Sequence, residues 1–172
     1  MILTGKKIIE EVFNKNIIIE PFDSNQVSTN SYDLRLGTQF LKYEEEIIDP
    51  KKKPKYNLLD IPEDGLDLNP GDFILATSEE IIGSEKYVPI IHSKSGTARA
   101  GLFVHITADL IDIGSVGKTT FQLFATLPIK LFPRMLLGQV SFWKTTGDIE
   151  LYDGKYQGTK EPMASLTYKD YK

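Results

Sequence analysis

The sequence of 172 residues contains no cysteine and only two histidines, His92 and His105. The lack of cysteine excludes disulfide bonds, thiol catalysis and every cysteine-ligated zinc or iron–sulfur site. Two histidines are too few for most histidine-based metal centres. We therefore expect no zinc and no metal site built from protein side chains.

Positive charge and long apolar runs are also scarce. The chain has 20 Lys and Arg against 24 Asp and Glu, which gives a formal net charge of -4. Such a surface offers no broad attraction to duplex nucleic acid or to an anionic membrane. No window of about 20 apolar residues is present, and Met1 to Lys6 does not have the pattern of a secretory signal. We expect a soluble, cytoplasmic protein without nucleic-acid or membrane partners.

One segment of the chain has a helical pattern. From Thr4, which can cap a helix, to about Asn16, apolar residues recur on one face at Ile8, Ile9, Val12 and Phe13. A length of 172 residues fits one domain, 1–172. The remainder of that domain has no comparable helical segment.

The other patterned segments are short runs rich in β-branched and aromatic residues, separated by turn sequences such as Asn69-Pro70-Gly71-Asp72. The polar, proline-broken stretch 49–64 is predicted to be an exposed loop. This spacing predicts an all-β fold, closed or sandwiched, with antiparallel strands. The predicted strands are Ile17–Ile19, Tyr32–Leu36, Phe73–Ala76, Leu102–Thr107, Thr119–Phe124, Ile129–Phe132 and Gln139–Trp143.

The segment Gly114–Thr119 looks like a phosphate-binding P-loop. That loop needs a first glycine where this chain has Asp112, and it needs a helix after Lys118. The residues that follow alternate as a strand does. We therefore reject the P-loop interpretation.

A better phosphate-binding candidate lies earlier in the chain. Two cations, a hydroxyl and a glycine-flanked backbone lie within six residues, contributed by Lys94, Ser95, Gly96 and Arg99. We expect this segment at the end of a strand. Charge-assisted hydrogen bonds from such groups suit phosphate oxygens. The alternative is an exposed turn whose charged side chains contact water and bind no ligand.

Six segments, in order, resemble the dCTP deaminase family, which shares a trimeric β fold with the dUTPases. They span nearly the whole chain: Met1–Leu3, Ser31–Gly37, Lys94–Leu102, Thr107–Gly114, Gly117 and Tyr152–Gly158. The resemblance implies a distorted antiparallel β-barrel, jelly-roll-like and of the dUTPase type, with a short amino-terminal helix. It also implies a homotrimer in which Lys94–Arg99 of one chain and Asp112–Gln122 of another share a site, closed by a tail formed by residues 148–172.

The resemblance further assigns roles at the site. Ser95, Arg99 and Asp112 are the expected catalytic residues besides position 122, with Asp112 facing the sugar or orienting a water. Mg²⁺ would come with the bound triphosphate. The expected substrate-binding residues are Lys94, Ser95, Gly96, Arg99, Thr107, Ala108, Asp112, Gln122, Tyr152, Lys155, Tyr156 and Thr159. Of these, Ala108 reads the pyrimidine edge through its backbone, and the Tyr152–Thr159 group belongs to the tail. His105 is expected to pack or bond in the core.

Position 122 departs from the family pattern. The family carries a glutamate general base there, and this chain carries Gln122. An amide can position water or bind a pyrimidine edge, but it cannot accept and return a proton at neutral pH. Further departures are Ser115, Asp109, Thr159 and Glu161.

Three functions therefore remain open. The first is metal-free deamination of dCTP to dUTP and ammonia. The second is a dUTP diphosphatase that uses Asp112 and Mg²⁺ to form dUMP and pyrophosphate. The third is a nucleotide-binding regulator without turnover, with dTTP as a further regulatory ligand.

Overall fold

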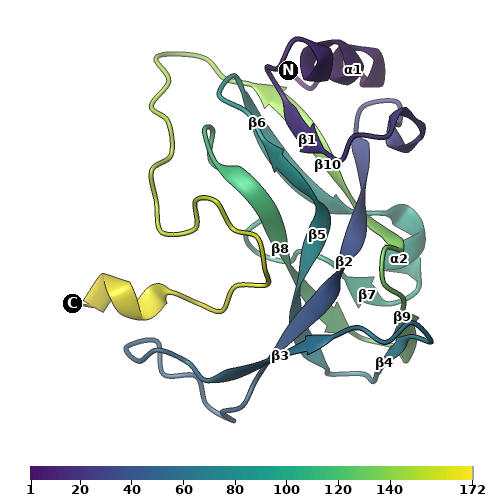
Figure 1. Cartoon of the computed structure of the whole chain (residues 1–172), viewed down its shortest axis with the longest axis vertical. Coiled ribbons are helices and arrows are strands. Elements are labelled where there is room, and N and C mark those ends of the chain that lie inside the picture. Colours follow the sequence, from purple (N-terminus) through teal and green to yellow (C-terminus); the bar gives the residue numbers. More distant parts are fainter. Residues whose placement is uncertain (172) are drawn as a thin grey trace.

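The computed structural model of the chain describes residues 1–171, and its regular structure is mainly antiparallel β-strand (Figure 1). The elements in chain order are α1 (Gly5–Phe13), β1 (Ile18–Glu20), η1 (Ser24–Gln26), β2 (Tyr32–Tyr43), β3 (Tyr56–Asp60), β4 (Leu66–Leu68), β5 (Phe73–Gly83), β6 (Tyr87–Ser93), α2 (Ser95–Arg99), β7 (Leu102–Phe103), β8 (Val116–Ala125), β9 (Ile129–Leu131), β10 (Leu136–Lys144) and η2 (Thr167–Tyr171).

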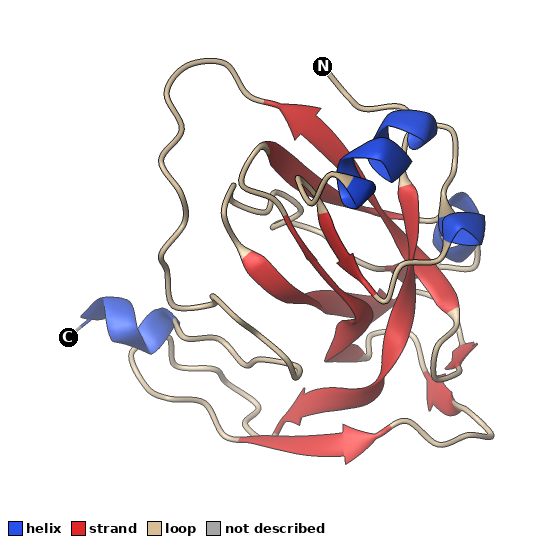
Figure 2. Cartoon of the chain, turned by 45° about the horizontal axis from the view of Figure 1, so that its top comes forward, coloured by secondary structure: helices blue, strands red, loops and turns tan. Residues whose placement is uncertain are grey.

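The main sheet runs in the order β6-β10-β2-β5-β8-β7, and all of its pairs are antiparallel. β1 also pairs with β5 and β3 with β2, while β4 and β9 form a separate two-stranded sheet. The segment after β7 then returns to β6, where Ile91 donates its N–H to the carbonyl of Asp109 at 2.9 Å, and Ile111 to that of Pro89 at 2.9 Å. The ends of the sheet are thus joined, and the expected antiparallel β-barrel with a short amino-terminal helix is confirmed (Figure 2).

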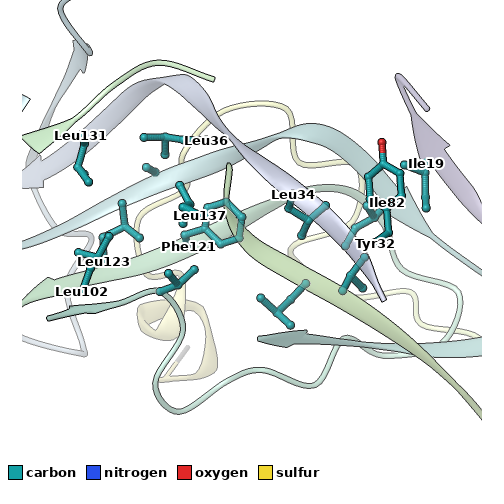
Figure 3. Packing of buried hydrophobic residues seen from close by; sticks show 14 of the residues in the cluster. Ile19, Tyr32, Leu34, Leu36, Ile82, Leu102, Phe121, Leu123, Leu131 and Leu137 are labelled. Carbon is teal, nitrogen blue, oxygen red and sulfur yellow. The ribbon is translucent and has the colours of Figure 1, made fainter. Parts of the chain in front are cut away.

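The core fills the inside of this barrel. Alternate residues of the strands point inward, as the period of two requires. Figure 3 shows Leu34 and Leu36 of β2 facing Phe121 of β8 and Leu137 of β10, all with no exposed surface. A cluster of this size is the main source of stability for a chain without disulfides.

A bulge interrupts β5 between Thr77 and Ile81, where β8 continues without insertion. The hydroxyl of Ser78 lies inside it, donating to the carbonyl of Glu80 at 2.7 Å and accepting the N–H of Thr119 at 2.9 Å. Glu80 is fully buried and accepts a hydrogen bond from Arg35 Nε at 2.7 Å. Bulges of this kind redirect side chains beside functional sites.

The amino-terminal helix is shorter than expected, and its buried face differs. Thr4 is at the N-cap position but makes no side-chain capping bond, and the helix ends at Phe13. Phe13 is 76% exposed, whereas Glu11 is only 4% exposed. Glu11 tolerates burial because Lys7 Nζ lies 2.8 Å from one carboxylate oxygen and Asn16 Nδ2 donates to the other at 2.7 Å.

Several strand predictions need correction. The predicted strand 102–107 is a strand only at Leu102–Phe103. The stretch 49–64, expected to be an open loop, contains β3, which pairs with β2 although its five residues are exposed. The sequence interpretation missed β4 and β6. The rejection of a P-loop at Gly114–Thr119 is supported, since Lys118 and Thr119 belong to β8 rather than to a helix.

The segment expected at a strand end is instead the helix α2, Ser95–Arg99. Its amides bond locally, with Ala98 N–H donating to the carbonyl of Lys94 at 2.9 Å. Small residues at three of its five positions leave it no apolar face to bury, and none of its residues is buried. None of the helices described within residues 1–171 is long and apolar enough to cross a membrane.

Candidate active site

A cavity of about 690 Å³ lies between β8, the segment after β7, and the carboxy-terminal tail. Its size falls in the range of small-molecule sites. The lining residues are Tyr43, Phe73, Leu75, Ile82, His105, Ile106, Thr107, Ala108, Leu110, Ile111, Asp112, Ser115, Gly117, Lys118, Thr119, Thr120, Gln122, Tyr152, Tyr156, Thr159, Met163, Ala164 and Ser165.

One wall of the cavity is a face of β8. Lys118, Thr120 and Gln122 alternate along the strand, so their side chains share this face, and each is half-buried. The N–H of Gln122 donates to the carbonyl of Val104 at 3.1 Å. This bond fixes the backbone of Gln122 against the segment that forms the second wall.

The second wall is the segment from His105 to Asp112. The imidazole Nε2 of His105 lies 2.6 Å from the carbonyl oxygen of Ala108, so it donates a hydrogen bond in the neutral tautomer. This bond confirms that His105 bonds within the fold, although His105 also lines the cavity. Burial lowers the pKa of the imidazole. Its Nδ1 is the one buried side-chain nitrogen or oxygen in residues 1–171 without a hydrogen-bond partner.

Thr107, Ala108 and Asp112 follow along the same wall, and all three are exposed. Asp112 begins a turn, since its carbonyl accepts the N–H of Ser115 at 3.0 Å and Gly114 has a φ of 88°. A non-glycine residue would be strained at that φ. The turn holds the Asp112 side chain at the edge of the cavity.

The tail covers the cavity through Tyr152, Tyr156 and Thr159. The Tyr152 hydroxyl accepts the N–H of Tyr156 at 3.1 Å, and the Thr159 hydroxyl donates to the carbonyl of Tyr156 at 2.7 Å. Further along, Ser165 donates its N–H to the Tyr43 hydroxyl at 2.9 Å. Burial raises the pKa of Tyr43. The tail is therefore attached to β2 as well as to itself.

The cavity has a very small set of charges. Within residues 1–171, Asp112 is the only carboxylate and Lys118 the only lysine or arginine among the lining residues. Groups of three or more His, Cys, Asp or Glu that could hold a metal ion are absent from the described part of the chain. Hence a hard cation in this cavity could take at most one carboxylate from this chain.

Five expected site residues do not line the cavity. Lys94 pairs with Asp33 of β2, and the other residues of its group, Ser95, Gly96 and Arg99, lie on exposed α2. The guanidinium of Arg99 donates a hydrogen bond to the carbonyl of Ser95 at 3.3 Å. Figure 1 shows α2 and the carboxy-terminal tail on opposite sides of the molecule.

The fifth is Lys155, which is paired with Asp170 of η2. Its Nζ lies 2.7 and 2.5 Å from the two carboxylate oxygens. This contact holds the lysine against the end of the chain. The cavity therefore brings together Thr107, Ala108, Asp112, Gln122, Tyr152, Tyr156 and Thr159 from the expected set.

Several polar residues of the cavity were not expected at the site, and Tyr43 and Lys118 are two of them. Lys118 could have been found, because it alternates with Thr120 and Gln122 on a predicted strand. Tyr43 lies at the end of β2, far in sequence from the other lining residues, and contacts the tail through Ser165, which no local pattern reveals.

Comparisons with known proteins show the family and the fold of the chain. A family model described as dCTP deaminase-like matches residues 2–145. The chain is 42% identical over 172 residues to a protein of Clostridium beijerinckii and to one of Hathewaya histolytica, both named "dCTP deaminase, dUMP-forming", with 99% of each chain covered. A 2'-deoxycytidine 5'-triphosphate deaminase from Agrobacterium tumefaciens has the same fold, with a TM-score of 0.66 at 21% identity, over 82% of this chain and 47% of that chain. The chain belongs to the dCTP deaminase-like family.

Proposed function

We propose that the protein forms dUMP by hydrolysing a pyrimidine deoxynucleoside triphosphate in this cavity, with dUTP as the substrate of the reaction that its own residues support. The observation that carries the proposal is the meeting of Asp112, Gln122 and the tail residues on one cavity. The identity of the chain to relatives named as dUMP-forming supports the same product.

Asp112 orients and deprotonates the attacking water. The water oxygen bonds to the α-phosphorus, the bond from that phosphorus to the bridging oxygen breaks, and pyrophosphate leaves. The proton of the water passes to the Asp112 carboxylate, the only carboxylate of the cavity within residues 1–171. The tail residues exclude bulk water from this reaction.

Gln122 binds the pyrimidine edge and does not act as a base. Its amide carries both a donor and an acceptor, so it can hydrogen-bond to uracil, but it has no proton-accepting carboxylate. His105 fixes the carbonyl of Ala108 on the opposite wall. The cavity can therefore recognise the pyrimidine base, but residue 122 cannot transfer a proton to it as the glutamate of the family would.

Mg²⁺ accompanies the triphosphate in this proposal. Oxygen ligands suit this ion, and the phosphate oxygens of the substrate would hold it, which leaves the Asp112 carboxylate free to accept a proton. When bound, Mg²⁺ supplies charge neutralisation of the phosphates. Asp112 contributes the proton acceptor.

The proposed assembly is a homotrimer with sites between subunits. Lys94, Ser95 and Arg99 lie away from the cavity of their own chain, on the opposite side of the molecule from the tail. In a cyclic assembly the α2 helix of one subunit can face the cavity of the next. This arrangement gives Arg99 of α2 and the preceding Lys94 a ligand to bind.

The test uses the full chain with Mg²⁺ and either dUTP or dCTP, followed by chromatographic separation of the products. We expect dUMP and pyrophosphate from dUTP, and a loss of kcat of about 10²-fold or more in Asp112→Asn. Asp109→Asn, a neighbouring exposed carboxylate outside the cavity, is the matched control and stays within about twofold of the unmodified chain. Full activity in Asp112→Asn contradicts the assigned role.

Deamination of dCTP is the second candidate, favoured by the relatives named "dCTP deaminase, dUMP-forming". It predicts ammonia release from dCTP by the unmodified chain. Under our proposal ammonia appears only in Gln122→Glu, where a carboxylate stands beside the base. Binding of dUTP and dCTP without any product contradicts both candidates and supports the regulatory alternative.

A further inference from the structure

Lys118 was not among the residues expected to bind substrate, yet it is the only cation of the cavity within the described 171 residues. Its side chain is 26% exposed, and the strand alternation directs it to the same face as Thr120 and Gln122. The expected cations, Lys94, Arg99 and Lys155, do not line the cavity.

The backbone of Lys118 is held from two sides. It pairs with Ile81 of β5 in the main sheet, and its N–H donates to the carbonyl of Thr159 in the tail at 2.7 Å. A lysine on a fixed backbone loses less entropy when it binds an anion than one on a mobile loop does. The position is therefore preorganised for a ligand between β8 and the tail.

The ammonium group of Lys118 is only weakly engaged. It forms an ion pair with Glu79 at 3.7 Å between Nζ and Oε2, which exceeds hydrogen-bond distance. Glu79 lies on the bulge of β5 and is also 3.9 Å from Arg134 Nε. The Glu79 carboxylate thus lies near two cations, Lys118 and Arg134, at distances longer than a hydrogen bond. The N–H groups of the Lys118 ammonium can therefore donate to an anion that binds more closely.

The distance along β8 suits the two ends of a nucleotide. Lys118 and Gln122 are four residues apart, which spans roughly 14 Å at about 3.4 Å per residue. A base at Gln122 therefore leaves room for the phosphates toward Lys118. The turn that carries Asp112 precedes the same end of the strand.

We propose that Lys118 binds the phosphate chain of the ligand, and that Glu79 competes with the phosphates for this ammonium group. The proposal that the anion is a nucleoside triphosphate rests on the proposed function. The existence of the anion site does not rest on the proposed function, because inorganic tripolyphosphate has the same chain of phosphate groups without a base and can test the site alone.

The experiment is calorimetric titration of the full chain with dUTP, tripolyphosphate and deoxyuridine. In Lys118→Gln we expect the Kd of dUTP and of tripolyphosphate to rise about tenfold or more, and the Kd of deoxyuridine to stay within about twofold. Lys118→Arg restores most of the lost affinity. Glu79→Gln tightens both anions a few-fold and leaves deoxyuridine unchanged.

Lys130→Gln is the matched control, since Lys130 pairs with Asp67 at 2.8 Å on the separate β4-β9 sheet. It should leave all three Kd values unchanged, and thermal unfolding should show every variant folded. Equal binding of both anions by the unmodified chain and Lys118→Gln overturns the inference, as does equal loss of deoxyuridine binding.

The outcomes separate this inference from the proposed function. If tripolyphosphate binding depends on Lys118 while neither dUTP nor dCTP is converted, the anion site stands and the proposed function fails. If dUTP is hydrolysed while Lys118→Gln binds it normally, the proposed function stands and the anion site fails. Absence of binding of either anion to the unmodified chain overturns both.

Discussion

The N–H of Lys118 donates to the carbonyl of Thr159 at 2.7 Å, so the tail is hydrogen-bonded to the strand that carries Gln122. Gly117 lies directly beside this contact. A Cβ atom at Gly117 would be 2.8 Å from the Thr159 nitrogen and 3.0 Å from its oxygen. The closed tail therefore depends on the absence of a side chain at position 117.

Gly117→Ala should displace the tail without unfolding the barrel. The added methyl group meets tail backbone, which must move, whereas the main-chain conformation at 117 suits any residue. We expect faster proteolytic cleavage of the tail, a KM for dUTP raised about tenfold, and a nearly unchanged Tm. Lys160→Ala, an exposed tail residue, is the control. Unaltered cleavage kinetics in Gly117→Ala contradict the tail contact.

Lys15→Gly should stabilise the protein by about 1 kcal/mol, because Lys15 has a φ of 59° in the left-handed region. It ends α1 in a Schellman arrangement, with Lys15 N–H donating to Val12 O at 3.0 Å and Asn16 N–H to Glu11 O at 2.9 Å. Urea unfolding measures the change. Lys15→Ala keeps the backbone strain and should show no such gain. A gain of equal size in both variants would assign it to loss of the lysine side chain.

Acid should destabilise the protein through Glu11. The hydrogen bond from Lys7 holds the pKa of this carboxyl at about 2, below its ordinary value of 4.5. The unfolded chain therefore binds the proton first, and the stability contributed by Glu11 is present above pH 4.5 and is lost as the pH falls toward 2.

This pH dependence is measured as Tm between pH 5 and pH 2. Glu11→Gln should lower Tm at pH 5 and flatten the decline over this window. Glu20→Gln, an exposed residue of β1, should follow the unmodified chain. A decline in Glu11→Gln as steep as that of the unmodified chain would show that another carboxyl is responsible.

Glu80→Ala should lower the free energy of unfolding by about 3 kcal/mol. Glu80 is fully buried and accepts hydrogen bonds from Arg35 Nε at 2.7 Å, Arg35 N–H at 3.0 Å and Gln26 Nε2 at 3.1 Å. Its removal leaves three donors without their acceptor. Glu79→Ala next to it removes only long, partly exposed pairs and should cost less than about 1 kcal/mol. Chemical denaturation compares the two variants, and equal losses would contradict the buried network.

The alternating apolar pattern of β8 and β10 sufficed to predict both strands, whereas the barrel they belong to was implied by the family resemblance. It failed for β3, whose Leu58 and Leu59 are exposed on a strand paired through one edge only. Its strand state comes from hydrogen bonds to β2, which are invisible to a local pattern. Phe13 was misplaced for a different reason, since the charged Glu11 takes a buried position where Lys7 and Asn16 contact its carboxylate.

Most of the expected residues on β8, on the segment after β7 and in the tail do meet at one cavity, because the turn at Asp112 and the alternation of β8 are local properties. The placement of Lys94 and Arg99 away from it depends on where α2 packs, on β7. Lys155 was expected to bind substrate, yet Asp170 lies near it through the path of the tail. Long-range chain paths of this kind are beyond what residue spacing can indicate.

The segment after β7, which forms the second wall of the cavity, is hydrogen-bonded to β6 although it is a connecting segment. Because Ile91 and Ile111 bond across this join, the wall cannot swing aside unless the two ends of the sheet separate. Amide protons of Ile91 and Ile111 should thus exchange with deuterated solvent about as slowly as those of the barrel interior. Of the two walls and the tail, the tail is then the part of the cavity that is not tied into this join of the sheet.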